Sequence, residues 1–347
     1  MIRRQNDCYW AQRYYFFAYF CKKNVILKNK NLFSLPISHE KQCVQDEIQS
    51  LLAHSPEILR EYWNYLFTTQ GKLIRSAFLL SVSKILNKTN SDTLRSAALV
   101  ELIHQASLIH DDVIDQSDTR RYKKSVPALW GNQLAVLLGD LLYTLAMELA
   151  IETPKAVQKE ILTACRLMTE GEILQHKSIL SDSKAVYFQI IERKTGALFA
   201  AACAMAAICA ECSESEVSDW RNFGLTCGVL FQIRDDLMDF LPEKQTGKPA
   251  FKDLSDQKLT LPVLETLSIL LPEDKIQFLN QIQSFSESNS EQIMQTLHET
   301  KGLENAQQEI RNLSAKALEF LMRQNRCEAA VELEEIIKEL SNKSSHD

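Results

Sequence analysis

The chain is poor in the two residues that most often interrupt helices, with only 9 Gly and 8 Pro among 347 residues. A fold built from many short strands and tight turns needs both residues more often, because they supply the backbone angles of turns. Leu, Ala, Glu, Lys and Gln, which favour helices, are frequent instead. We therefore expect an all-α protein, long enough to bury a substantial core.

A disulfide framework is also missing, although the chain has nine cysteines. They are Cys8, Cys21, Cys43, Cys165, Cys203, Cys209, Cys212, Cys227 and Cys327. Their odd number and their scatter through apolar stretches are typical of a reducing compartment rather than of a secreted scaffold. Cys209 and Cys212 form a C-x-x-C pair, but neither a second pair nor a pair of histidines follows it. A role in the core is therefore favoured over a metal or redox role.

Long apolar runs are scarce as well, and no stretch reaches the roughly 20 apolar residues that span a bilayer. The longest uncharged candidate, residues 195–210, has 16 residues and is rich in small side chains. It predicts a helix that is buried among neighbouring helices. We expect a soluble, cytoplasmic protein.

The net charge of −6 argues against a basic body that binds nucleic acid, so no nucleic-acid partner is expected. Residues 1–38 carry seven Lys or Arg but only one acidic residue, Asp7, which leaves −12 for the rest of the chain. An anionic substrate must therefore be held by local clusters of cations or by metal ions on carboxylates.

Residues 1–42 differ from the rest of the chain and form an N-terminal extension of unknown role. They contain the aromatic run YWAQRYYFFAYF, followed by the basic run KKNVILKNKN. Organelle-targeting segments are basic and acid-poor like this one, but they usually have more Ser and fewer aromatics. Targeting, a membrane-surface anchor, a disordered tail and a start site assigned too far upstream all stay open.

Residues 43–347 are predicted to form a single helical domain. Apolar residues recur at helical spacing between short polar joints, which predicts about ten or more helices. The residues expected to cap helices at these joints are Ser91 or Asp92, Ser215 and Ser290. The joint at 241–256 is longer than packing needs, and we interpret it as a lid.

Two acidic clusters, DDVID and DDLMD, follow apolar helical runs and share one spacing. They contain Asp111, Asp112 and Asp115, and Asp235, Asp236 and Asp239. On a helix the first and third carboxylates of such a cluster are stacked one turn apart, and the middle one is displaced by about 100°. Like charges at this spacing repel, so a cation is expected between them, and Mg²⁺ suits oxygen ligands. One cluster alone is typical of a solvated helix end, whereas two favour a metal site.

Six motifs carry a resemblance to a known family. They are GKLIR (71–75), ELIHQASLIHDDVIDQSDTRR (101–121), GEILQ (171–175), KTGALF (194–199), FQIRDDLMDF (231–240) and GKPAFKDLSDQKLTLP (247–262). In this order they resemble the motif series of the trans-isoprenyl diphosphate synthases, also called polyprenyl synthetases, over about residues 43–340. The resemblance implies mostly antiparallel helices around a deep central cavity, with the two aspartate clusters facing each other across its mouth.

The resemblance also implies the ligands and the reaction. The six aspartates hold three Mg²⁺ ions together with an allylic diphosphate, and isopentenyl diphosphate is the second substrate. Lys72, Arg75, His104 and Arg121 match the family's isopentenyl diphosphate pocket, and Arg120, Lys194, Lys248 and Lys258 match its contacts to the allylic diphosphate. Lys194, Thr195 and Gln232 are the expected catalytic residues, the last two offering dipoles to a carbocation. The released diphosphate takes the final proton, so no protein base is expected.

Product length is expected to depend on residues before Asp111. Ala106 and Ser107 are small, whereas short-chain members of the family have bulky aromatics there. A small residue in a helix is also common packing, but the open positions favour a product of roughly C30 to C50, made for quinone side chains from a farnesyl or geranylgeranyl primer. Met147, or a neighbour within 141–150, is the expected floor. A short-chain synthase making C15 to C20 products is the alternative.

Two positions depart from the family pattern, because Ser76 follows Arg75 where proline is usual and Tyr122 replaces a glycine. A terpene cyclase and a non-catalytic partner subunit remain rival interpretations. Both usually lack one of the two aspartate clusters, and this chain keeps both. The resemblance implies a homodimer, and product release implies a peripheral membrane contact.

Overall fold

The computed structural model describes residues 38–68, 73–120, 123–241 and 250–341. Its α-helices are α2 (Ser38–Ala53), α3 (Arg60–Thr68), α4 (Ile74–Ile85), α5 (Ser91–Ile114), α6 (Val126–Trp130), α7 (Asn132–Ile151), α8 (Lys155–Lys177), α9 (Lys184–Ile191), α10 (Ala197–Cys209), α11 (Glu214–Met238), α13 (Lys252–Ser255), α14 (Leu261–Leu267), α15 (Pro272–Gln283), α16 (Ser290–Glu299), α17 (Gly302–Met322) and α18 (Glu328–Ser341). Two 3₁₀ turns, Glu57–Leu59 and Glu287–Asn289, and one π-helical turn, Glu192–Gly196, join them. The strands β1 (Thr119–Arg120) and β2 (Lys123–Lys124) form an antiparallel hairpin. The predicted all-α class is confirmed.

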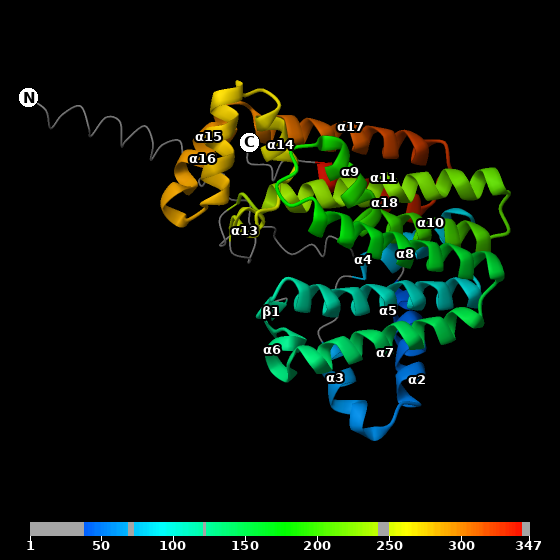
Figure 1. Cartoon of the computed structure of the whole chain (residues 1–347). Coiled ribbons are helices and arrows are strands. Elements are labelled where there is room, and N and C mark those ends of the chain that lie inside the picture. The colour runs from blue at the N-terminus through cyan, green and yellow to red at the C-terminus, as the bar shows by residue number, and fades with distance from the viewer. Residues whose placement is uncertain (1–37, 69–72, 121–122, 242–249, 342–347) are drawn as a thin grey trace, which may run out of the picture.

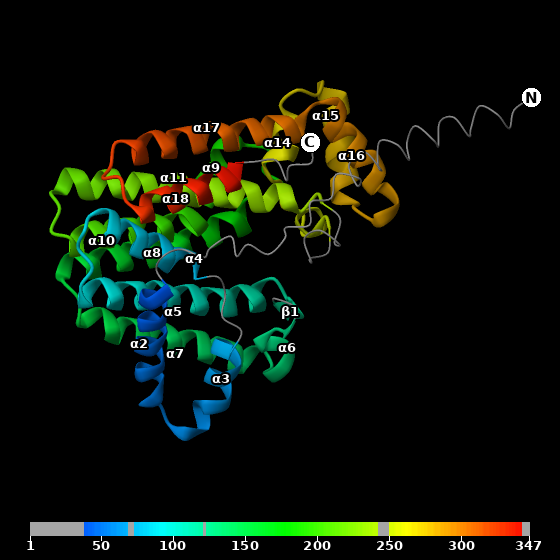
Figure 2. The ribbon, with the colours of Figure 1, turned by 180° about the vertical axis from the view of Figure 1, so that it is seen from behind.

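The long helices lie side by side in a bundle with α10 at its centre (Figure 1). Helix α10 packs against α4, α8 and α11, and nearly all of its residues are buried. Its small Ala side chains allow these neighbours to approach closely. A helix buried among its neighbours was predicted for residues 195–210. Seen from behind, α18 lies in front of α11, and α17 runs along the top of the bundle beside α11 (Figure 2).

Helix starts were predicted at the right joints but at the wrong residues. Helix α5 is capped by Asn90, whose side chain accepts a hydrogen bond from the Thr93 N–H at 2.9 Å. Helix α11 is capped by Ser213, whose hydroxyl accepts from the Glu216 N–H at 3.4 Å. Ser290 is the first residue of α16 and not its cap. A capping oxygen must reach N–H groups two or three residues ahead, and several polar residues at each joint can do so.

Helix α2 begins at Ser38, inside the segment that was assigned to the N-terminal extension. It packs against α4 and α5, and Val44 and Ile48 on it are buried. Among the described residues, helical structure of the bundle therefore begins before residue 43.

Helix α7 was missed as a long apolar helix. Its 20 residues are apolar enough to cross a membrane by length and composition, and 39% of its most apolar window is buried in the protein. Asp140 and Glu148 interrupt the apolar run in the sequence, so no uncharged stretch marks this helix. One face of α7 packs along α5, and Leu137 and Ile151 on another face are exposed.

The seven cysteines within the described residues are all free thiols. Cys203, Cys209 and Cys227 are buried in the core, and the Cys209 sulfur lies 3.7 Å from the Ser96 hydroxyl. Burial raises the pKa of the Cys209 thiol, which keeps it protonated and unreactive.

Candidate active site

The two aspartate clusters lie at the C-terminal ends of α5 and α11, which reach the same end of the bundle near α13 (Figure 1). Asp115 is the C-terminal cap residue of α5, and Asp239 is that of α11. The C-terminal end of a helix carries partial negative charge, so acidic residues there are unfavourable unless cations compensate them. The fold therefore places both clusters where positive charge is needed.

Lys252 and Lys258, in the segment that follows the second cluster, make contacts at the ends of both clusters. Lys258 Nζ lies 3.2 Å from the Asp115 Oδ1, and the Lys258 pKa is raised by neighbouring carboxylates despite burial. The Lys252 backbone N–H donates to Asp239 Oδ1 at 3.0 Å, and its Nζ donates to the Ser117 hydroxyl at 3.1 Å. The segment that holds these lysines therefore contacts Asp239 of the second cluster, and Asp115 and Ser117 at the end of the first.

The middle aspartate of each cluster points into the protein. Asp112 is 2% exposed, and its Oδ1 accepts from the Arg120 Nε at 2.9 Å and from Arg120 Nη2. Asp236 is 4% exposed, and it accepts from the Tyr187 hydroxyl at 2.5 Å and from Gln232 Nε2 at 2.8 Å. The displacement of the middle carboxylate by about 100° on a helix is the reason for this orientation.

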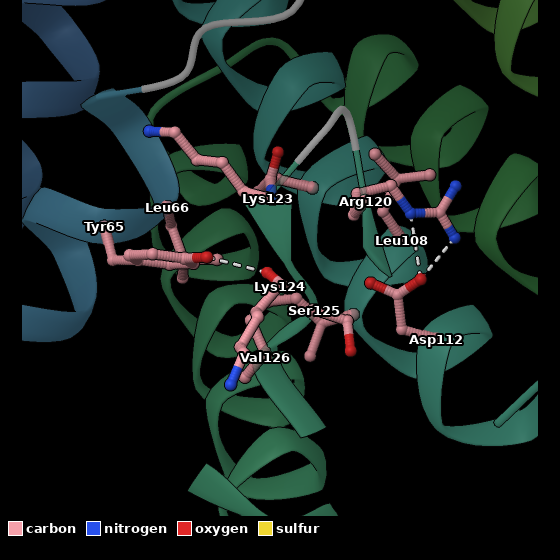
Figure 3. Close-up of a pocket in the computed structure, with 11 residues that line it drawn as sticks. Tyr65, Leu66, Leu108, Asp112, Arg120, Lys123, Lys124, Ser125 and Val126 are labelled. Atoms are coloured by element: carbon pink, nitrogen blue, oxygen red, sulfur yellow. Dashed lines mark hydrogen bonds and ion pairs between the residues drawn. The ribbon is translucent and has the colours of Figure 1, made fainter. Parts of the chain in front are cut away.

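A small cavity of about 40 Å³ flanks the pair formed by Asp112 and Arg120 (Figure 3). It is lined by Tyr65, Leu66, Gln105, Leu108, Ile109, Asp112, Arg120, Lys123, Lys124, Ser125 and Val126. The Tyr65 hydroxyl donates to the Lys124 carbonyl oxygen at 2.7 Å, which fastens α3 to the hairpin that carries Arg120. The space suits a few water molecules rather than a substrate.

Burial raises the pKa of the carboxyl groups at this end of the bundle. The Asp111 pKa rises to about 6 because burial outweighs the attraction of Lys194, and Glu172 and Asp115 raise it further. Burial raises the pKa of Asp236 to about 7, although the bonds from Tyr187 and Gln232 oppose this rise. The carboxylates therefore lack sufficient positive charge, and a divalent cation would supply it.

The donor set fits Mg²⁺ rather than a closed metal cage. Within the described parts of the chain, no group of three or more His, Cys, Asp and Glu side chains is arranged to hold a metal ion. Mg²⁺ is usually held by one or two carboxylates together with water and substrate phosphates, so the outer aspartates suffice. Asp111, Asp115, Asp235 and Asp239 are all at least partly exposed and can serve as these ligands.

Lys194 and Thr195 lie in the π-helical turn between α9 and α10. Such turns are rare and frequently occur at functional sites. Lys194 Nζ lies 2.5 Å from a Glu172 carboxylate oxygen, and the Thr195 hydroxyl donates to Gln232 Oε1 at 2.7 Å. A side chain at Gly171 would come within 2.8 Å of the Lys194 backbone nitrogen, so glycine is required for α8 to approach this turn.

Of the residues expected to hold isopentenyl diphosphate, the structure describes Arg75 and His104. Arg75 Nη1 donates to His104 Nε2 at 2.9 Å, and its guanidinium lies 5.0 Å from the centre of the Phe199 ring. Lys72 and Arg121, with Lys248 of the allylic set and Tyr122, lie outside the described residues, as does half of the predicted lid, residues 242–249.

The residues expected to control product length lie below the first cluster. Ala106 is fully buried, whereas Ser107 and Met147 are half-buried. Tyr143 lies one turn before Met147 on α7, and its ring stacks with His110 at 5.8 Å between centroids. Burial raises the Tyr143 pKa, and Cys165 and Asp111 are the groups whose charge contributes. Tyr143 therefore lies nearer to Asp111 than the predicted floor does.

Sequence reasoning missed Tyr187, Lys252 and Asp253. The Asp253 N–H donates to Asp239 Oδ2 at 3.0 Å, and its side chain is buried enough that its pKa is raised. Lys252 and Asp253 lie inside a motif from which only Lys248 and Lys258 were selected, so the signal was present. Tyr187 precedes Lys194 by seven residues, which is two helical turns, but this spacing alone is common.

Comparison with known proteins identifies the family. A family model for polyprenyl synthetase matches residues 56–300. The heptaprenyl diphosphate synthase component 2 of Geobacillus stearothermophilus is 36% identical over 248 residues, which cover 70% of this chain and 77% of that protein. A short chain isoprenyl diphosphate synthase of Methanothermobacter thermautotrophicus is 33% identical over 235 residues, which cover 65% and 72%.

A solved structure shows the same fold. The polyprenyl synthase of Caulobacter crescentus, in complex with calcium and isoprenyl diphosphate, superposes with a TM-score of 0.82 at 28% identity, covering 89% of this chain and 96% of that one. The chain belongs to the polyprenyl synthetase family. It is an enzyme, a trans-prenyltransferase that makes prenyl diphosphates, as the resemblance implied.

Proposed function

We propose that the enzyme condenses isopentenyl diphosphate with farnesyl or geranylgeranyl diphosphate to a trans-polyprenyl diphosphate of roughly C30 to C50. The observation that supports the reaction is the position of both aspartate clusters at one end of the bundle, where Lys252 contacts the second cluster and Lys258 contacts the first. The names of its relatives include heptaprenyl and short-chain synthases, so chain length rests on the residues below Asp111.

The chain's own residues then divide the work. Asp111, Asp115, Asp235 and Asp239 would hold Mg²⁺, which when bound neutralises the diphosphate and stabilises the charge on it as it leaves. Lys194, Lys258 and Arg120 add positive charge to the same diphosphate. Lys258 and Arg120 leave their present carboxylate partners when the substrate and metal bind.

Bond changes follow from the loss of the diphosphate. The allylic carbon–oxygen bond breaks, the double bond of isopentenyl diphosphate attacks the resulting carbocation, and the released diphosphate takes the proton that is lost. The oxygens of Thr195 and Gln232 offer dipoles to the cation without attacking it. Arg75 and His104, together with Lys72 and Arg121, orient isopentenyl diphosphate.

The deciding experiment incubates the purified chain with Mg²⁺, farnesyl diphosphate and labelled isopentenyl diphosphate, and sizes the dephosphorylated products by chromatography. Products that extend to C30 or beyond are expected. Products that stop at C15 to C20 would keep the reaction but favour the short-chain alternative. Absence of elongation would contradict the proposed function of the chain acting alone.

Two variants locate the floor of the product site. Met147→Ala is expected to lengthen the product and Ser107→Phe to shorten it, because both side chains are half-buried below Asp111. Tyr143→Ala is the matched comparison on the same face of α7. If Tyr143→Ala lengthens the product and Met147→Ala does not, Tyr143 is the floor and the product is shorter than proposed.

We also propose that the enzyme is a homodimer that uses the outer face of α7. Val136, Leu137 and Ile151 on this helix are 41%, 63% and 72% exposed. Exposed large apolar side chains along one helix favour its burial against a partner. Light scattering should give twice the chain mass, and Leu137→Lys should shift it toward one chain.

A two-component synthase is the second candidate, because one relative is named as a component of a heptaprenyl diphosphate synthase. A chain that binds Mg²⁺ and diphosphate but elongates nothing by itself would favour this candidate. Release of a long apolar product also favours a peripheral contact with a membrane surface, which flotation with lipid vesicles would detect.

A further inference from the structure

Asp236 has both carboxylate oxygens engaged inside the protein. Its Oδ2 accepts from the Tyr187 hydroxyl at 2.5 Å, and its Oδ1 accepts from Gln232 Nε2 at 2.8 Å. Only 4% of Asp236 and 7% of Tyr187 are exposed. The neighbouring Asp235, by contrast, is exposed. The two adjacent carboxylates therefore face different surroundings, and only one of them faces solvent.

Two hydrogen bonds link Asp236, through Gln232, to the π-helical turn. The amide nitrogen of Gln232 donates to Asp236 Oδ1, so the amide oxygen of Gln232 faces away from Asp236. That oxygen accepts from the Thr195 hydroxyl at 2.7 Å. The orientation of the Gln232 amide, and with it the position of the Thr195 oxygen, is thus set by Asp236.

Tyr187 completes this network from α9. Its hydroxyl donates to the Asp236 oxygen that Gln232 does not use, and its ring packs edge-on against Phe188 at 5.4 Å between centroids. The network joins α9, the π-helical turn and α11 through side chains alone. Helices α9 and α11 are also in contact, so the network is supported by packing.

We propose that Tyr187 is a positioning residue for prenyl transfer: through Asp236 it fixes the Gln232 amide, which in turn holds the Thr195 hydroxyl beside Lys194. Asp236 then belongs to this network rather than to the ligands of a divalent cation. This inference rests on the proposed function, because Thr195 and Gln232 act there on the carbocation. A network of this kind orients a reacting group without contacting the substrate.

The test removes the hydroxyl and keeps the ring. Tyr187→Phe is expected to lower kcat by about 10-fold to 100-fold, the range for loss of a group that orients a site. KM for both diphosphates and the Mg²⁺ concentration for half-maximal activity should change by less than about twofold, because substrate and metal contacts remain. Thr266→Val is the control, since it removes a buried side-chain hydrogen bond, 2.8 Å to the Thr300 hydroxyl, away from the site. It should cost stability but leave kcat unchanged.

A second readout does not depend on turnover. The rise in melting temperature caused by Mg²⁺ with inorganic diphosphate should persist in Asp236→Asn and disappear in Asp235→Asn. If Asp236→Asn loses this rise as Asp235→Asn does, Asp236 is a metal ligand and the inference is overturned. A Tyr187→Phe enzyme with unchanged kcat overturns it as well. An inactive wild-type chain would instead contradict the proposed function itself.

Discussion

The two aspartate clusters share a spacing but differ in the partners of their middle carboxylates. In the first cluster Asp112 pairs with the cation Arg120, which comes from a hairpin that directly follows α5. In the second cluster Asp236 pairs with the neutral groups of Tyr187 and Gln232. The same sequence pattern thus produces one ion pair and one neutral hydrogen-bonded network.

The difference concerns how each cluster responds to substrate. Arg120 is expected to contact the allylic diphosphate, so binding would separate it from Asp112 and leave that carboxylate without its present cation. Tyr187 and Gln232 carry no charge and have no reason to leave Asp236. The first cluster is therefore suited to rearrange, whereas the second cluster is suited to stay fixed.

The largest effect is expected from the outer aspartates, which we propose as the metal ligands in both clusters. Asp111→Asn and Asp235→Asn should each lower kcat by about 10³-fold, because charge on the leaving diphosphate is then less well compensated. Prenyl transfer at saturating Mg²⁺ measures this. The matched variants Asp112→Asn and Asp236→Asn should show a smaller loss of kcat. Equal losses at outer and middle positions would remove the distinction between them.

The next effect separates the ion pair from the neutral network. Arg120→Gln leaves Asp112 buried without its cation and should lower the free energy of unfolding by about 1 to 3 kcal/mol, allowing for partial exposure of Arg120. Adding Asp112→Asn should recover most of this loss. The coupling should weaken at high salt.

A double-mutant cycle of the same kind, with Tyr187→Phe and Asp236→Asn, measures the coupling free energy within the second cluster. Its coupling should be smaller, about 1 kcal/mol, and nearly independent of salt, because no charged donor is involved. Urea unfolding at two salt concentrations measures both cycles. A salt-dependent coupling between Tyr187 and Asp236 would show that the two clusters do not differ in this way.

The clusters themselves were predictable from sequence, and so was the displacement of their middle members by about 100° around the helix. The hydrogen-bond partners of the middle aspartates were not predictable, because Tyr187 lies 49 residues before Asp236 and nothing in the local spacing pairs them. The same reason explains why Lys252 was passed over within a motif that had been recognised. The π-helical turn was not predicted either, and its close contact with α8 at Gly171 is tertiary, so local spacing does not reveal it.

The pH dependence of stability tests the burial of Asp236. Its pKa of about 7 in the folded chain exceeds the ordinary value of 3.8, so the folded state binds more protons between these values. Stability of the metal-free protein should therefore fall as pH rises through this range. Asp236→Asn cannot titrate, so its melting temperature should fall by several degrees less between pH 5 and pH 8. Parallel curves for both proteins would contradict burial as the cause of the raised pKa.

The smallest effect concerns a third buried carboxylate, Glu101, which is stabilised by a backbone group. Its Oε1 accepts from the Ser76 N–H at 3.0 Å, next to Arg75 and at the point where family members usually have proline. Ser76→Ala keeps this N–H, whereas Ser76→Pro removes it although proline is tolerated in the first helical turn. Ser76→Pro should therefore lower the free energy of unfolding by about 1 kcal/mol more than Ser76→Ala does. It should also raise KM for isopentenyl diphosphate about two- to fivefold, because α4 positions Arg75. Equal behaviour of the two variants would mean that Glu101 does not need this donor.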